Sequence, residues 1–368
     1  MKSVSPANST TRAPSGARIR FAHHIIELGD GRRVGVSVGG HGVPLIFFHG
    51  IGMNRQVYLK LLSRLPQLGF LVVAIDAPGH GQSFAPRRGE HTFAHRIAVT
   101  EQILEGLGIG RAVLVGHSMG GRTAAELAAR HPERALAVVL IDPAVGGAFD
   151  ASRMRIASPV KTGAALAVAI SDTILDRVGL RRLDHLRYLR TLSRLFFNTA
   201  SHPGMFASAA SAIARADDSA TALTALRAAG SRVVIIHGEL DKIVPLESAV
   251  DAATLSGALL VTLPRAYHSW VLTTPWTFAD LFDRLITDDR LGSELRTAVA
   301  QTNQSGSPSG NSDGMYADGA LVLSLTPTIS ILGNAYPPRR RMYHRYRIWN
   351  AQEITDYGLG RPHPAETD

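Results

Sequence analysis

The sequence predicts an α/β fold in which a mostly parallel sheet is covered by helices on both faces. Short runs rich in Val, Leu and Ile alternate along the chain with segments whose apolar residues recur at helical spacing. One of these runs, "AVLVGHS", passes through a tight turn directly into an Ala-rich helical pattern that stops at Pro132. The alternation breaks between about residues 145 and 230, where long helical segments predict an insertion above the sheet.

Eight strands are expected in chain order. The first two form an antiparallel hairpin, because the "GDG" between them favours a tight turn. The others are short apolar runs, which suit parallel strands that are buried on both faces. The expected strands are 25–28, 32–38, 44–50, 70–81, 112–118, 135–144, 232–241 and 258–269. Helices are expected at 55–68, 93–108, 120–132 and 245–256, with a closing helix at 276–286.

Composition excludes several classes of protein. The chain of 368 residues has no cysteine, which excludes disulfides, Cys-ligated zinc and a thiol nucleophile. Its N-terminal "MKSVSPANSTTRAPSGAR" lacks the apolar stretch of a secretory signal, and no run of about 20 apolar residues could span a bilayer. We therefore expect a cytoplasmic protein. The formal net charge of +9 comes mostly from arginine, much of it between Arg153 and Arg227. Nucleic-acid binding usually shows a compact basic face with interleaved aromatics or a recognisable module, so no nucleic-acid partner is expected.

These patterns divide the chain into four parts. Residues 1–17 are expected to be a flexible leader, and residues 18–144 with 231–290 form the α/β core. Residues 145–230 form a helical cap. Residues 291–368 are expected to be a Gly- and Ser-rich linker followed by an extension of unknown role. Contact of the cap or of this extension with a membrane surface is a weaker alternative to a loosely packed tail.

Two serines, Ser118 and Ser37, stand in a G-x-S-x-G pattern, and their surroundings distinguish them. A nucleophilic serine of this type needs a buried strand before it, a tight turn and a helix directly after it, so that the hydroxyl projects above the sheet. Ser118 in "VLVGHSMGG" has all three. Ser37 is followed by "VGGHGVP", in which Gly and Pro cannot start a helix, and we interpret it as an ordinary strand residue.

A serine hydroxyl needs a base to take its proton and a carboxylate to orient that base. His268 follows the last expected strand, where its ring can reach the sheet edge that carries Ser118. Asp241 follows the strand before it and is the preferred acid. Asp142, at the end of an earlier strand, is the competing candidate, but Pro143 follows it directly and the chain must turn there into the cap.

Other histidines and two backbone groups complete the expected site. His49 and His237 each precede a glycine corner, where hydrogen bonds to backbone are the expected role, and His117 is expected to point into the protein. An oxyanion requires preorganised N–H donors. Met119, directly after the nucleophile, supplies one N–H. The loop "HGIGMN" supplies the other, from Ile51 or alternatively from Gly52.

With these pieces in order, residues 20 to 290 resemble the α/β-hydrolase superfamily. The resemblance rests on "HGIG", "DAPGHGQS", "GHSMGG", "GELDKIVP" and "YHSW", each after the expected strand. It implies an eight-stranded, mostly parallel sheet with a helical cap between strands 6 and 7. It also implies a structural role for Asp76 and His80. Tyr267 departs from the family, which commonly has Gly before the histidine. The implied site residues are Ser118 as nucleophile, Asp241 as acid, His268 as base, and Ile51 and Met119 as oxyanion donors.

A serine at the nucleophile position implies acyl chemistry, since family members that open epoxides or remove halide have Asp there. The expected function is hydrolysis of carboxylic esters with an apolar acyl group through an acyl-enzyme, without cofactor or metal. The expected partner is a small ester or lipid-like substrate, and the oligomeric state is left open. Carbon–carbon bond hydrolysis, perhydrolysis and a non-catalytic ligand-binding role are the alternatives.

Overall fold

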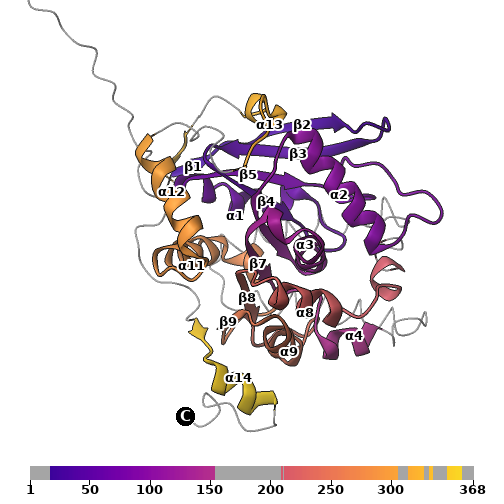
Figure 1. The fold of residues 1–368 in the computed structure, drawn as a ribbon, viewed down its shortest axis with the longest axis vertical. Coiled ribbons are helices and arrows are strands. Elements are labelled where there is room, and N and C mark those ends of the chain that lie inside the picture. The colour runs from indigo at the N-terminus through magenta and orange to yellow at the C-terminus, as the bar shows by residue number, and fades with distance from the viewer. Residues whose placement is uncertain are drawn as a thin grey trace, which may run out of the picture.

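A nine-stranded sheet forms the centre of the computed structural model (Figure 1). The structure describes residues 17–153, 209, 211–305, 314–326, 331–334 and 346–358. The strands, in their order across the sheet, are β11 (Arg347–Ile348), β9 (Leu259–Leu263), β8 (Val233–Gly238), β7 (Ala135–Ile141), β6 (Ala112–His117), β4 (Val43–Phe48), β5 (Phe70–Ile75), β3 (Arg33–Gly40) and β2 (Ala22–Glu27).

The pairing of the strands confirms the predicted mostly parallel sheet. Strands β4 to β9 pair in parallel, whereas β2, β3 and β11 run antiparallel to their neighbours. Strands β4, β5, β6 and β8 are buried along their whole length, as strands covered on both faces must be. Eight of the nine strands are those expected from the sequence, and the ninth, β11, is added by the C-terminal extension.

Helices cover both faces of the sheet (Figure 1). Helices α11 and α12 lie on one face, and α2, α3, α8 and α9 lie on the other. The longer helices are α2 (Phe93–Leu107), α3 (Met119–Arg130), α8 (Ala220–Ala228), α9 (Leu246–Ser256), α11 (Pro275–Thr287) and α12 (Ser293–Ser305). Shorter ones are α1 (Leu59–Leu62), α4 (Gly147–Arg153), α10 (Trp270–Thr273), α13 (Leu321–Ser324) and α14 (Ala351–Gly358). None of the helices in the described ranges is both long and apolar enough to cross a membrane.

The helix predicted over residues 55–68 is wrong as a continuous element. The segment instead forms the 3₁₀ turn η1 (Arg55–Tyr58), the single turn α1, and a second 3₁₀ turn η2 (Leu65–Leu68). Pro66 lies at the start of η2, where its ring disfavours helical geometry at the preceding residue and removes an N–H donor. The apolar residues of this segment recur at helical spacing, but the segment does not form one continuous helix.

Most of the predicted cap, residues 154–208 and 210, lies outside the described residues. The described ends of the insertion are helical, with α4 following β7 and α8 preceding β8.

The segment after residue 290 differs from the predicted linker. It begins with α12, whose side packed on the core carries Leu295, Ala298 and Val299, all buried together with Leu291 before the helix. Their helical spacing within "LGSELRTAVA" explains the helix. Further along, β10 (Ile331–Asn334) pairs with β1 (Ala17–Ile19), and β11 pairs with β9. The described parts of the extension therefore pack on the α/β core.

Candidate active site

Ser118 occupies a sharp turn between β6 and α3. Its backbone has φ 55° and ψ −120°, a conformation that residues other than glycine rarely adopt. Two glycines allow this turn to close. A Cβ at Gly116 would overlap the carbonyl of Gly120, and a Cβ at Gly120 would overlap the carbonyl of Phe48 at the end of β4. The local sequence thus places the serine at the carboxyl edge of the sheet, and Ser118 is 6% exposed.

Asp241 and His268 are in direct contact. The Nδ1–H of His268, after β9, donates to Oδ2 of Asp241, after β8, over 2.6 Å. The other carboxylate oxygen of Asp241 accepts from the backbone N–H groups of Ile243 and Val244, each at 2.8 Å. Burial alone would raise the pKa of Asp241, but the charge and hydrogen bond of His268 outweigh it, so the pKa is lowered. The carboxylate is therefore charged and fixed in orientation.

His117 links the serine's strand to the loop of His268. Its Nε2 donates to the carbonyl of His268 at 3.1 Å, and its Nδ1 accepts from the hydroxyl of Tyr58 at 2.7 Å. The rings of His117 and His268 lie with their centroids 4.9 Å apart. Since Ser118 directly follows His117, this brings the His268 loop to the same sheet edge as the serine. Burial lowers the pKa of His117 to about 3, so the ring is neutral.

The loop after β4 lies against the serine turn. A Cβ on Gly50 would lie 3.4 Å from Cβ of Ser118. The N–H of Gly52 donates to Nε2 of His80 at 3.3 Å and is thereby engaged. Ile51, between these glycines, is the remaining candidate donor of this loop, and Met119 begins α3 on the other side of the serine.

The residues expected to be structural have structural contacts. His49 Nδ1 donates to the carbonyl of Gly50, and His237 Nε2 donates to the carbonyl of Val244. Asp76 forms a buried ion pair with Arg55. It also accepts from the backbone N–H of Gln82 at 2.9 Å, which closes the turn after β5.

Ser37, the other serine in a G-x-S-x-G pattern, lies inside β3 and is fully buried. Its hydroxyl accepts from Nε of Arg55 at 2.8 Å and contacts Nδ1 of His23 at 2.8 Å. No helix follows it, as expected for an ordinary strand residue.

Asp142 lies behind the Asp241–His268 pair. Its backbone has φ 41°, and its Oδ1 accepts from the N–H of Gly238 at 2.8 Å. Burial and the negative charge of Asp241 raise its pKa. Its Oδ2 is 3.9 Å from His117 Nε2. Asp142 and Asp241 are thus close, and Asp241 is the carboxylate that accepts the Nδ1–H of His268.

Two buried triplets near this site bring histidine and aspartate ligand atoms within 4.8 Å of one another, His117–Asp142–His268 and Asp142–His237–Asp241. Hydrogen bonds to backbone and to each other already engage most of these atoms, so we assign no metal to them. Tyr58, which holds His117, was not singled out from the sequence, because a tyrosine in an amphipathic segment looks like any other core residue.

Comparison with known proteins identifies the family of the chain. A family model for the alpha/beta hydrolase fold matches residues 43–275. A protein of Mycobacterium phage D29, named as a candidate non-heme haloperoxidase, is 36% identical over 269 residues, which is 72% of this chain and 95% of that protein. A 2-hydroxymuconate semialdehyde hydrolase of Pseudomonas putida is 28% identical over 243 residues, covering 61% of this chain and 80% of the relative.

Among solved structures, a bacterial membrane phospholipase A superposes with a TM-score of 0.60 at 22% identity, covering 75% of this chain and 88% of that one. At this identity the likeness concerns the fold. The family match and the phage relative together show that the chain belongs to the α/β-hydrolase family, a family of hydrolytic enzymes.

Proposed function

We propose that this hydrolase cleaves carboxylic esters with an apolar acyl group, using Ser118 as nucleophile, His268 as base and Asp241 as acid. The observation that carries the proposal is the 2.6 Å hydrogen bond between His268 and Asp241, on loops that meet the edge of the sheet where Ser118 sits in a strained turn. A base held in one tautomer by a buried carboxylate is what activation of a serine hydroxyl requires.

The chemistry follows from the roles of these groups. His268 Nε2 takes the proton of the Ser118 hydroxyl as its Oγ attacks the ester carbonyl. The protonated ring then returns that proton to the departing alcohol, which leaves an acyl-enzyme on Ser118. Water, activated by the same imidazole, hydrolyses the acyl-enzyme and restores the hydroxyl. Asp241 keeps Nδ1 protonated throughout and stabilises the positive charge of the ring.

We assign the stabilisation of the negative charge that develops on the carbonyl oxygen to the N–H groups of Ile51 and Met119. The hydrogen bond from Gly52 to His80 favours Ile51 over Gly52 as the first donor. The second donor, Met119, is the first residue of α3, where N–H groups are not used inside the helix. Donors fixed in advance stabilise the oxyanion without reorganisation.

Apolar side chains next to these donors support the choice of acyl group. Met119 packs with Phe93, Ala209 and Ala212, and Ile51 packs against this cluster. A neutral acyl chain that extends from the oxyanion site would contact these apolar side chains. The inferred substrate is a small or lipid-like ester, and the cytoplasmic location stays a prediction from the sequence.

A series of p-nitrophenyl esters of increasing acyl length tests the proposal. We expect kcat/KM to rise about fourfold per added methylene until the pocket is full, since each buried CH₂ contributes about 0.8 kcal/mol. Ser118→Ala should lower kcat by about 10⁶-fold, because the catalytic residues act as one unit and the loss of one member removes most of their joint contribution. Ser37→Ala, in the second G-x-S-x-G pattern, is the matched control and should stay within a few-fold. Equal losses in both variants would reject Ser118 as the nucleophile.

A second candidate is perhydrolysis or carbon–carbon bond hydrolysis with the same three residues. It is favoured by the names of two relatives, a candidate non-heme haloperoxidase and a 2-hydroxymuconate semialdehyde hydrolase. Peroxide-dependent halogenation and cleavage of a ring-fission product, measured beside the ester series, distinguish these activities. A kcat/KM for either that exceeds the best ester value would replace ester hydrolysis as the main activity.

A further inference from the structure

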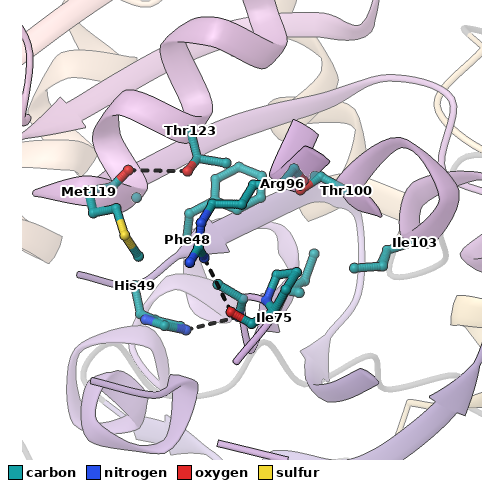
Figure 2. A pocket seen from close by; sticks show the side chains of 11 residues that line it. Phe48, His49, Ile75, Arg96, Thr100, Ile103, Met119 and Thr123 are labelled. Atoms are coloured by element: carbon teal, nitrogen blue, oxygen red, sulfur yellow. Dashed lines mark hydrogen bonds between the residues drawn. The ribbon is translucent and has the colours of Figure 1, made fainter. Parts of the chain in front are cut away.

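A small cavity lies behind the site, between the ends of β4 and β5 and the helices α2 and α3 (Figure 2). Its volume is about 20 Å³. Phe48 and His49 line one side, Thr100 and Thr123 line the helical side, and Arg96 of α2 points into it. The cavity has room for a species of about the size of one or two water molecules, because one water needs about 10–15 Å³. Met119, the candidate oxyanion donor, and Gly120 of the serine turn also line it.

Arg96 is buried there without a charged partner. The residue is 3% exposed, and its Nη1 donates to the carbonyl of Pro78 at 3.3 Å. Its Nε and Nη2 are buried and have no hydrogen-bond partner among the residues that the structure describes. Two other buried arginines differ in this respect, since Arg55 pairs with Asp76 and Arg122 pairs with Asp150 at 3.0 Å. No carboxylate of the described segments forms an ion pair with Arg96.

This arrangement requires a compensating negative charge. Removing a cation from water is costly unless an opposite charge or a full set of hydrogen bonds replaces the water. Burial lowers the pKa of Arg96 to about 10, so the guanidinium is still protonated at neutral pH. Two nitrogens of a guanidinium that lines the cavity therefore have unused hydrogen-bonding capacity.

The other lining groups cannot supply the missing charge. Thr100 donates its hydroxyl proton to the carbonyl of Arg96, and Thr123 donates its own to the carbonyl of Met119. His49 donates to Gly50 and accepts from the N–H of Ala77 at 3.0 Å. The donors that remain without an acceptor belong to the guanidinium, and an anion would match them.

We propose that the cavity at Arg96 binds a single-atom monovalent anion of the chloride class. Size favours a halide, because it is close to a water molecule in volume. Charge selects it over water, because a water molecule would leave the guanidinium uncompensated. This site is independent of the proposed ester hydrolysis.

The site also has a route to the oxyanion loop. The carbonyl of Pro78 accepts from Arg96 and contacts Nδ1 of His80 at 3.2 Å. The opposite nitrogen of His80 accepts from the N–H of Gly52. A halide bound at Arg96 would therefore fix the side chain of His80, which accepts a hydrogen bond from the oxyanion loop.

Thermal unfolding at constant ionic strength tests the site. When gluconate is replaced stepwise by chloride or bromide, we expect the melting temperature of the unmodified protein to rise with the logarithm of halide concentration above Kd. Arg96→Met, a neutral change of similar volume, should abolish the halide-dependent rise. Arg122→Met removes a buried arginine that has carboxylate partners, and it should keep the rise even if its melting temperature is lower. No rise in the unmodified protein, or an equal rise in Arg96→Met, would overturn the proposal.

Crystals of the unmodified protein grown in bromide give a test that does not depend on the folding of a variant. We expect an anomalous bromide peak within hydrogen-bond distance of Nε or Nη2 of Arg96. An ordered water in the cavity, with bromide peaks elsewhere only, would reject the site whatever the variants show.

Discussion

Two carboxylates lie near the candidate catalytic histidine, His268, at the ends of neighbouring strands, and their environments differ. Asp241 is held ionised by His268, whereas burial and the charge of Asp241 raise the pKa of Asp142. Asp241→Ala should lower kcat by about 10⁴-fold, because the histidine loses its orientation and its stabilised charge. Asp142→Ala should retain most of kcat in the folded fraction. Steady-state ester kinetics on both purified variants measure the difference, and the opposite ranking would move the acid to Asp142.

His117 makes stability depend on pH in a defined direction. Its folded-state pKa of about 3 lies below the usual 6.5, so the unfolded chain binds the proton more readily. Its contribution to the free energy of unfolding is therefore present above pH 6.5 and is lost as pH falls toward 3, by about 1.4 kcal/mol per pH unit. Asp142 opposes this trend, because a raised folded pKa favours folding at low pH.

Comparing His117→Gln with the unmodified protein isolates the histidine, since Asp142 is common to both. Urea unfolding between pH 4 and pH 7 should show a shallower fall in the free energy of unfolding for the variant, by about the slope of one group. Parallel curves over this range would show that His117 is not a buried neutral ring.

The candidate catalytic residues could be predicted because each follows a readable strand. The positions of Ser118, Asp241 and His268 can be predicted from the apolar strand segments "AVLVGHS", "RVVIIHGELD" and "ALLVTLPRAYHS". Parallel strands bring their carboxyl ends to one edge of the sheet. Arg96 had no such signal. A single arginine in an amphipathic helix normally snorkels to water, and only the packing of α2 against the strand ends buries it.

The turn that carries Ser118 depends on glycines that leave no room for a side chain. Gly116→Ala should destabilise the fold by about 1–3 kcal/mol and reduce activity, because the new Cβ overlaps the backbone of Gly120. Gly106→Ala is the matched control, since this exposed position in α2 has nothing within 4 Å of the added Cβ. There alanine should stabilise the helix by about 0.5–1 kcal/mol. Chemical denaturation of both variants measures the two changes in the free energy of unfolding. A change in the same direction for both variants would contradict the expectation.

Elements with many buried residues were predictable, and short ones were not. The parallel strands each contain five to seven residues, nearly all buried, which leaves an apolar run in the sequence. The two residues of β11 leave no pattern, and their partners in β9 are far away in the chain. Pro66 broke the helix expected over residues 55–68 because its backbone restriction outweighed a correct amphipathic pattern.

The C-terminal segment closes one edge of the sheet through Trp349. Its ring is 2% exposed, its Nε1–H donates to the hydroxyl of Thr262 at 2.8 Å, and its backbone N–H donates to the carbonyl of Leu260 at 3.0 Å. Trp349→Ala should lower the free energy of unfolding by about 3–5 kcal/mol. The exposed Gln352→Ala on α14 is the control and should change it by less than about 0.5 kcal/mol. Equal melting temperatures for the two variants would show that the segment does not pack on β9 in solution.

The position of β11 also affects how the protein is made. Thr262 is synthesised 87 residues before Trp349. During that interval a growing chain already has every strand of its parallel sheet, while the outer backbone groups of β9 have no neighbour from the tail. Such an edge is a template for strands of other nascent chains. Premature termination between His268 and Trp349 would therefore produce chains that contain all the candidate catalytic residues and have a strong tendency to aggregate. We expect such chains to need chaperones during translation, as a consequence of the strand order.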